Sequence, residues 1–215
     1  MIEDVDFLRK TGLQFFGTMT ASVSHELKNV LAILNENAGL MQDLTLMARK
    51  GASIDLERIN SLADRFCAQI NRADDIIKNL NRFAHTVDHD KVETDICDML
   101  RLTAVLAGRF ASMRGVAVES DRLPPSVSAE TNPFFLIQLI WLCLDYAMDA
   151  AGEPKRVVLE CRRTDSNVQI LFLDLHGNTE TSEKPLFSDM GKQLLHLLQA
   201  EIKLQPDIHA LVVTI

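Results

Sequence analysis

The segment Ser24–Asn29 has the sequence Ser-His-Glu-Leu-Lys-Asn and combines side chains that could transfer a phosphoryl group. An exposed ring nitrogen of His25 could attack an acyl or nucleotide phosphate if a neighbour orients the other ring nitrogen. Glu26 could accept the ring proton. Asn29 could position a water molecule or a phosphoryl oxygen, because a neutral amide does not repel phosphate. These residue types predict phosphoryl chemistry at His25.

The helix that must carry this segment, predicted from Val5 to Arg49, has one mostly apolar face. At 100° per residue, His25 is turned about 160° away from this face, and Asn29 follows one turn later on the exposed side. A lone surface histidine is usually just solvated, but the neighbouring carboxylate and amide favour a functional one. A break at Gly12 or Gly17 is compatible with the pattern. The apolar face consists of Phe16, Thr20, Val23, Leu27, Val30, Leu34, Asn37, Met41 and Leu44.

A second helix is predicted from Leu56 to Val87, after a turn and a new N-cap at residues 50–53. Two antiparallel helices give each seam a single partner, so a second copy of the chain would close the core as a dimeric four-helix bundle. The alternative is a bundle completed by later helices of the same chain, which the change in character after Asp88 disfavours. The seam is apolar throughout: Leu56, Ile59, Ala63, Phe66, Ile70, Ala73, Ile77, Leu80, Ala84 and Val87.

Composition restricts the class of protein. The chain has 215 residues, a net charge of −8 and 47% hydrophobic residues, which suits one or two globular domains. The acidic balance argues against nucleic-acid binding. No apolar run reaches the roughly 20 residues that span a bilayer, so we expect a cytoplasmic protein without a membrane partner. The four cysteines lack metal-ligand spacing and are expected to be reduced.

The second half of the chain has mixed α/β patterns. Together with the hairpin they predict an α+β protein with a helical domain at residues 1–90 and a sandwich of helices on one face of a sheet at 91–215. A helix start is predicted at Thr131 or Asn132, with Pro133 just inside. The predicted helices are Ile96–Met113, Phe134–Ala151 and Gly191–Ala200, and the strands are Val116–Glu119, Arg156–Arg162, Val168–Leu175 and Ala210–Ile215, with a hairpin turn at residues 164–167.

The segment Ser24–Asn29 resembles the H-box of sensor histidine kinases. That family places the H-box on the first helix of a dimerisation and phosphotransfer hairpin, and the resemblance extends over residues 13–88. It implies that His25 is the phosphoacceptor, Glu26 the general base, and Asn29 the residue that orients water during dephosphorylation of a response regulator. The family often has proline where this chain has Val30, which predicts a straighter first helix.

The second half is similar in outline to the family's ATP-binding domain but departs from it in chemistry. The helix beginning at Phe134 resembles the N-box helix, where the family has two asparagines facing ATP and Mg²⁺. This chain has Leu142 and Tyr146 at those positions. Leucine offers no oxygen to Mg²⁺, which leaves Asp145 and Asp149 as possible ligands.

The family's next element is an aspartate that receives the adenine amino group, followed by glycines that let the backbone approach the nucleotide. Asp174 is present, but His176 and Asn178 stand in the region of those glycines. Gly191 is a single glycine where the family has a glycine-rich lid. We therefore expect no cofactor, with ATP and Mg²⁺ bound through Asp145, Asp149 and Asp174 only as an alternative. No histidine has the spacing of a metal ligand, so no metal site is predicted.

Three functions remain open. The first is a dimeric phosphotransfer protein that exchanges phosphoryl groups between His25 and the aspartate of a response-regulator receiver domain, or dephosphorylates that regulator. The second is a divergent ATP-dependent autokinase. The third is a non-enzymatic dimeric scaffold that binds receivers.

Overall fold

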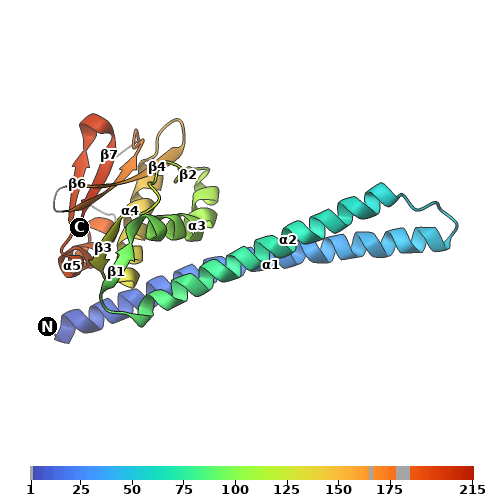
Figure 1. The fold of residues 1–215 in the computed structure, drawn as a ribbon, viewed down its shortest axis with the longest axis horizontal. Coiled ribbons are helices and arrows are strands. Elements are labelled where there is room, and N and C mark those ends of the chain that lie inside the picture. Colours follow the sequence, from blue (N-terminus) through green and yellow to red (C-terminus); the bar gives the residue numbers. More distant parts are fainter. Residues whose placement is uncertain (1, 165–166, 178–184) are drawn as a thin grey trace. The chain divides into compact units, whose positions relative to one another are not determined.

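A computed structural model describes residues 2–164, 167–177 and 185–215, with side chains from Lys10 onward. Two long helices form a hairpin and are followed by a domain built on a β-sheet (Figure 1). The α+β class predicted from the sequence is confirmed, and so is the helical hairpin.

The first helix of the hairpin, α1 (Ile2–Arg49), is continuous through Gly12 and Gly17, where the sequence allowed a break. The turn that follows contains Gly51 with a φ of 91°, a conformation that glycine adopts without steric strain. The second helix, α2, begins at Leu56 because the Asp55 carboxylate accepts the backbone N–H of Glu57 at 3.0 Å. The turn is where the sequence predicted it, but the N-cap is Asp55 rather than a residue of 50–53.

The second helix ends earlier than predicted. It spans Leu56–Ala84 and continues as a short 3₁₀ helix, η1 (His85–Asp88), so Val87 lies beyond the α-helix. The hydroxyl of Thr86 donates to the Phe83 carbonyl oxygen at 2.7 Å and satisfies an acceptor at the helix end. The predicted seam is therefore helical over all but its last position.

Only part of the α2 seam is covered within one chain. Leu62, which lies outside the predicted seam, is buried, while Ile59, Phe66 and Ala73 are half-buried. The alternate seam residues Ile70 and Ile77 are 56% and 46% exposed, and Leu31 of α1 is 62% exposed. The hairpin thus has one face between its helices and a second apolar face that the described part of the chain does not cover.

The sheet domain has five strands in the order β2-β4-β5-β7-β6 and a separate two-stranded sheet, β1-β3. β2 is parallel to β4, and the other neighbours are antiparallel. The bounds are β1 (Val92–Asp95), α3 (Ile96–Arg114), β2 (Ala117–Glu119), β3 (Ser128–Thr131), α4 (Pro133–Ala150), β4 (Arg156–Arg163), β5 (Val168–Leu173), η2 (Pro185–Phe187), α5 (Asp189–Leu198), β6 (Glu201–Gln205), η3 (Pro206–Ile208) and β7 (Ala210–Thr214).

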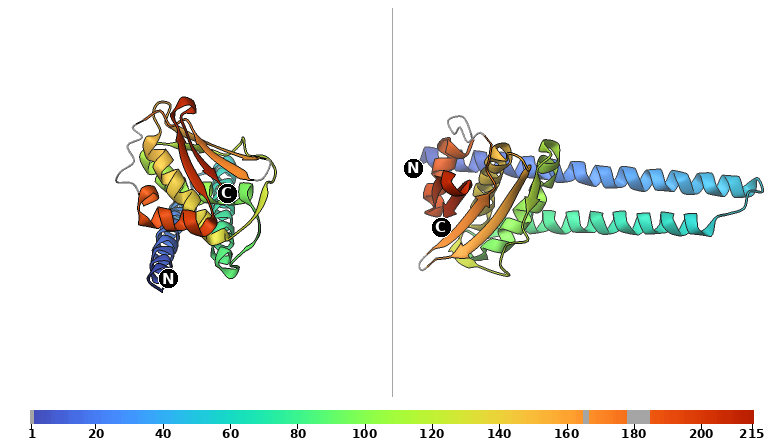
Figure 2. Two further views of the ribbon diagram at one scale, coloured as in Figure 1. Left: turned by 90° about the vertical axis from the view of Figure 1, so that its left-hand side faces the viewer. Right: turned by 90° about the horizontal axis from the view of Figure 1, so that it is seen from above.

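The core of this domain lies between the helices and one face of the sheet. Alternate residues of β5, Ile170 and Phe172, join a large buried cluster with Leu144 of α4 and Leu100 of α3, whereas Leu171 belongs to a small separate cluster with Val212. α4 and α3 pack on each other and on β4, and Figure 2 shows them beside the sheet. The predicted arrangement of helices on one sheet face is confirmed.

The predicted elements match the structure except at short or polar segments. The β4–β5 hairpin and the helices α3, α4 and α5 are present, and of the two proposed caps it is Asn132 that accepts the Phe135 N–H, at 3.0 Å. The strands β1, β3 and β6 are absent from the prediction. β1 and β3 have four residues each and few apolar side chains, so no apolar alternation marks them. β6 does alternate, with Ile202 and Leu204 between polar residues, and this pattern is a signal that could have predicted it.

The chain forms two compact units. One is Met19–Arg82, and the other combines residues up to Thr18 with Phe83–Ile215. Within the unit that contains the sheet, an aromatic cluster joins the ends of the two hairpin helices to the sheet domain. The Phe83 ring stacks on Phe16 at 5.2 Å and meets Phe134 at 6.2 Å, and Phe15 contacts both Phe83 and Phe134. The domain boundary predicted at residue 90 lies where the helical hairpin ends, whereas the compact units divide the hairpin itself at residues 18 and 82.

Candidate active site

The H-box residues lie on α1 with their functional side outward. His25 and Asn29 are exposed, Glu26 is half-buried, and Val23 and Val30 are buried on the opposite face. The helical pattern therefore places His25 and Asn29 where a partner arriving from solvent can reach them. The roles of His25, Glu26 and Asn29 stay predictions.

Beneath this exposed face the hairpin interior contains polar atoms. The side-chain atoms Thr20 Oγ1, Ser22 Oγ, Asn37 Nδ2 and Gln69 Oε1 are buried without a hydrogen-bond partner in the part of the chain that the structure describes. A buried polar atom without a partner destabilises a fold by about 1–3 kcal/mol. The interior of the hairpin around His25 thus contains buried polar atoms that an apolar core would not have.

The helix α4 turns Leu142 and Tyr146 into the core. Leu142 is 5% exposed and Tyr146 is 2% exposed. The Tyr146 ring packs edge-on against Phe187 of η2, with centroids 5.5 Å apart. Burial also raises the pKa of the Tyr146 hydroxyl, which keeps it neutral. Neither position presents an oxygen ligand for Mg²⁺ to solvent.

Asp145 and Asp149, the two carboxylates considered as Mg²⁺ ligands, are paired with the same arginine. Arg114 at the end of α3 donates from Nη2 to Asp145 at 2.7 Å and from Nε to Asp149 at 2.9 Å. All three side chains are largely covered, so the guanidinium competes directly with any cation for these oxygens. Asp145 and Asp149 thus lie close together as partners of Arg114.

The third predicted nucleotide ligand is also paired. Asp174 follows β5 with a φ of 70° and accepts a hydrogen bond from Arg156 Nε. This bond, reinforced by the charge of Asp174, raises the pKa of the Arg156 guanidinium. Because Arg156 belongs to the neighbouring strand β4, the ion pair joins two adjacent strands of the sheet.

The chain after Asp174 packs directly on the end of α4. Gly177 N–H donates to the Ala150 carbonyl oxygen at 2.8 Å, and a Cβ at Gly152 would lie 2.8 Å from His176 Cβ. These glycines allow backbone segments of the protein to approach one another, rather than a nucleotide. Asn178 lies outside the described residues.

Gly191 has a similar structural explanation. A Cβ at this position would lie 1.8 Å from the Leu186 carbonyl oxygen, so the first turn of α5 can pack on η2 only with glycine there. Gly191, the single glycine at the position of the family's lid, thus permits the close packing of α5 on η2. The segment before it, residues 178–184, is not described.

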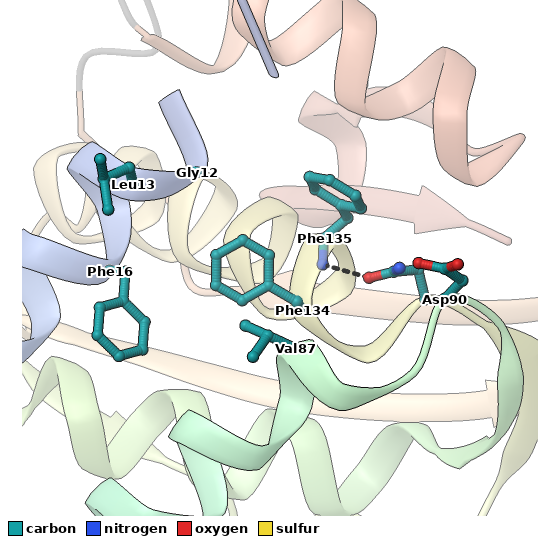
Figure 3. A pocket seen from close by; sticks show the side chains of 8 residues that line it. Gly12, Leu13, Phe16, Val87, Asp90, Phe134 and Phe135 are labelled. Carbon is teal, nitrogen blue, oxygen red and sulfur yellow. Dashed lines mark hydrogen bonds between the residues drawn. The ribbon is translucent and has the colours of Figure 1, made fainter. Parts of the chain in front are cut away.

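The structure also assembles sites that sequence reasoning missed. A cavity of about 440 Å³ at the base of the hairpin is lined by Phe16, Phe134 and Phe135, with Leu13 and Val87 at its wall (Figure 3). Elsewhere, the rings of His176 and His209 lie 4.2 Å apart although 33 positions separate them in the chain. No local pattern signals either site, because the contributing residues come from different elements.

No family model and no curated protein matches the sequence. Solved structures do resemble it. The Acinetobacter baumannii histidine kinase AdeS is 14% identical, with 88% of this chain and 95% of that chain covered and a TM-score of 0.47. Sensor histidine kinases are thus among the solved structures that resemble it in fold. A bacterial phosphotransferase is 12% identical, with 94% of this chain and 95% of that chain covered and a TM-score of 0.45.

The cytoplasmic segment of the histidine kinase QseC is 16% identical, with 67% of this chain and 92% of that chain covered and a TM-score of 0.40. With TM-scores below 0.5, these likenesses decide no activity, and the function proposed below rests on the residues of this chain. One described helix, α4, is long and apolar enough to cross a membrane, but 72% of it is buried inside the domain as its core helix.

Proposed function

We propose that this protein is a histidine phosphotransfer protein of two-component signalling, which exchanges phosphoryl groups between His25 and the aspartate of a response-regulator receiver domain. The observation that supports it is a contrast within the chain. His25 and Asn29 are exposed, whereas the carboxylates that could hold ATP and Mg²⁺ are paired with Arg114 and Arg156.

The proposed transfer balances without a cofactor. The unprotonated ring nitrogen of neutral His25 attacks the phosphorus of the receiver's aspartyl phosphate, the phosphorus–oxygen bond to the aspartate breaks, and a nitrogen–phosphorus bond forms. Glu26 accepts the proton that the other ring nitrogen then releases. The reverse sequence passes the phosphoryl group to a receiver. Asn29 positions a water molecule when the aspartyl phosphate is hydrolysed instead.

We further propose that the working form is a homodimer. Burial of apolar surface stabilises association by about 25 cal/mol per Å², and the uncovered face of the hairpin contains Leu31, Ile70 and Ile77. A second copy presents an identical face, so the two hairpins can close a four-helix bundle. The required receiver partner places the protein in the cytoplasm, and neither nucleic acid nor a membrane takes part.

Transfer can be tested with receiver domains labelled on aspartate by radioactive acetyl phosphate and then freed of the reagent. We expect label to move to this chain as an acid-labile phosphohistidine, or to be released as inorganic phosphate. His25→Gln should abolish the transfer and Asn29→Ala should slow the release. His85→Gln, at an exposed histidine of η1, is the matched control and should have no effect. Equal transfer by wild type and His25→Gln would contradict the role of His25, and no transfer by either protein would leave only the scaffold function.

The dimer can be tested by light scattering. Ile70→Glu and Ile77→Glu should each shift the chain toward monomer, because a charge would be buried in the bundle. Val105→Glu is the control, since Val105 is a comparably exposed apolar residue on α3. A monomeric wild type at micromolar concentration would contradict the proposal.

Nucleotide binding separates phosphotransfer from autokinase activity. We expect calorimetry at millimolar ATP and Mg²⁺ to show no binding, and we expect no labelling of His25 from radioactive ATP. Binding that is lost in Asp174→Asn would instead support the autokinase, with Asp174 acting on adenine.

A further inference from the structure

One corner of the sheet domain brings two histidines together from distant parts of the chain. His176 follows the end of β5, and His209 lies between η3 and β7. A backbone hydrogen bond joins the two segments next to the histidines, because the Leu175 N–H donates to the His209 carbonyl oxygen at 2.9 Å. The imidazole centroids are 4.2 Å apart with an angle of 51° between the ring planes.

Both rings are accessible to a ligand from solvent. His176 and His209 are exposed, and they border a cavity of about 240 Å³ whose other walls include Leu204 and Pro206. The cavity is therefore apolar apart from the two imidazoles and the backbone. A ligand entering it meets the two rings as the principal polar side-chain groups among the residues that line it.

The two histidines are held in place by their backbones. His209 has a φ of 48°, which is unfavourable for a residue with a side chain, and its N–H donates to the Pro206 carbonyl oxygen at 3.0 Å. His176 donates its N–H to the Asp174 carbonyl oxygen at 3.1 Å and packs against Gly152. Folding thus fixes both Cβ atoms before any ligand binds, and rotation about the side-chain bonds can adjust the rings.

We propose that His176 and His209 together bind a divalent transition-metal ion, with Zn²⁺, Ni²⁺ and Cu²⁺ as the matching class. Imidazole nitrogen is a preferred ligand of these ions. Metal–nitrogen bonds of about 2.0–2.1 Å place two ligating nitrogens about 3 Å apart, which rings in this contact can reach. Water completes the coordination shell, because no third His, Cys, Asp or Glu joins a metal-binding group within the described residues.

The bound ion links the end of β5 to the turn before β7. A metal that binds the folded chain in preference to the unfolded chain raises its thermal stability. The site is independent of the proposed phosphotransfer, which uses no residue of this corner.

The test uses the full chain with the metal ions alone. Calorimetry with Ni²⁺ or Zn²⁺ should show one site per chain, and His176→Ala should weaken it at least tenfold. His209→Gly is the sharper variant, because it removes the ring while glycine suits the positive φ. It should abolish metal binding and the metal-dependent rise in melting temperature, while the melting temperature of the metal-free protein stays equal or increases.

His196→Ala, on α5, is the matched control and should bind metal as the wild type does. Unchanged affinity in His209→Gly would overturn the proposal and leave the ring pair as a packing contact. An equal loss in His196→Ala would also overturn it, because the metal would then bind at another site.

Discussion

The hairpin and the sheet domain use their apolar residues in opposite ways. In the sheet domain, large side chains such as Phe172, Leu144 and Leu159 are fully buried in one continuous core. In the hairpin, Ile70 and Ile77 are exposed, while Nδ2 of the buried Asn37 has no hydrogen-bond partner among the residues that the structure describes. The difference supports the proposal that a second copy of the chain covers the hairpin, whereas the core of the sheet domain is buried within one chain.

The same contrast applies to charge. The carboxylates of the sheet domain are paired with arginines at each position where a nucleotide could be bound, as Asp145 and Asp174 show. In the hairpin the His25 face is open to solvent. The carboxylates that were considered as nucleotide ligands are thus held in ion pairs, whereas the proposed phosphoacceptor is accessible.

The largest effect is expected in the core of the sheet domain. Phe172→Ala should lower the free energy of unfolding by about 3–5 kcal/mol, because it leaves a cavity at a fully buried position. Denaturant titration measures it. The loss should be the same at low and high protein concentration, whereas the stability of the hairpin should rise with concentration if a dimer completes it. If the stability of the sheet domain rose with protein concentration and that of the hairpin did not, the sheet domain would be the part that needs a second copy.

A second effect concerns close packing in the sheet domain. Gly191→Ala should destabilise the protein by about 1–3 kcal/mol, because its methyl group would overlap the Leu186 carbonyl oxygen. Gly108→Ala is the control on α3, where nothing lies within 4 Å, and it should stabilise by about 0.5–1 kcal/mol. Thermal unfolding of the two variants compares them. Equal stability of both would show that α5 does not pack on η2 as described.

A third effect is pH-dependent. Asp95 caps α3 by accepting the N–H groups of Cys97 and Asp98 at 2.9 and 3.2 Å. Burial acts to raise the pKa of this carboxyl, but hydrogen bonds from Ser126 and backbone N–H groups outweigh it and lower the pKa. Because the folded pKa lies below the unfolded one, the stabilisation is complete above the unfolded pKa and disappears as pH falls through the folded pKa.

Asp95→Ala should therefore lower the free energy of unfolding by about 1 kcal/mol at pH 7. The difference from wild type should shrink below about pH 4, near the ordinary pKa of aspartate. Denaturant titrations at pH 7 and pH 3 measure both values. A difference that grows in acid would contradict the capping role.

The smallest effect is expected in the hairpin. Asn37→Leu should raise the free energy of unfolding by up to about 1 kcal/mol. The substitution removes a buried amide whose Nδ2 has no hydrogen-bond partner among the described residues, and an apolar side chain takes its place. Val30→Leu, at a buried apolar position of the same helix, is the control and should bring no gain. A loss of stability in Asn37→Leu would indicate that the amide is satisfied across a dimer interface.

The sequence predicted the features that depend on neighbours along the chain. The spacing of apolar residues gave α1 and α2, and the helical period placed His25 and Asn29 outward. Asn132 and Pro133 marked the start of α4. The short strand β6 was missed although Ile202 and Leu204 alternate with the exposed Glu201 and Lys203, a local pattern that could have predicted it.

What the sequence determined by itself is the helical hairpin, the α+β class and the resemblance carried by Ser24–Asn29, since helical periodicity and motif spacing are local properties. Only the tertiary structure decided that Arg114 occupies Asp145 and Asp149, and that His176 meets His209. These pairs join residues about 30 positions apart through strand order and helix packing. Such contacts depend on how whole elements pack, so no pattern of adjacent residues encodes them.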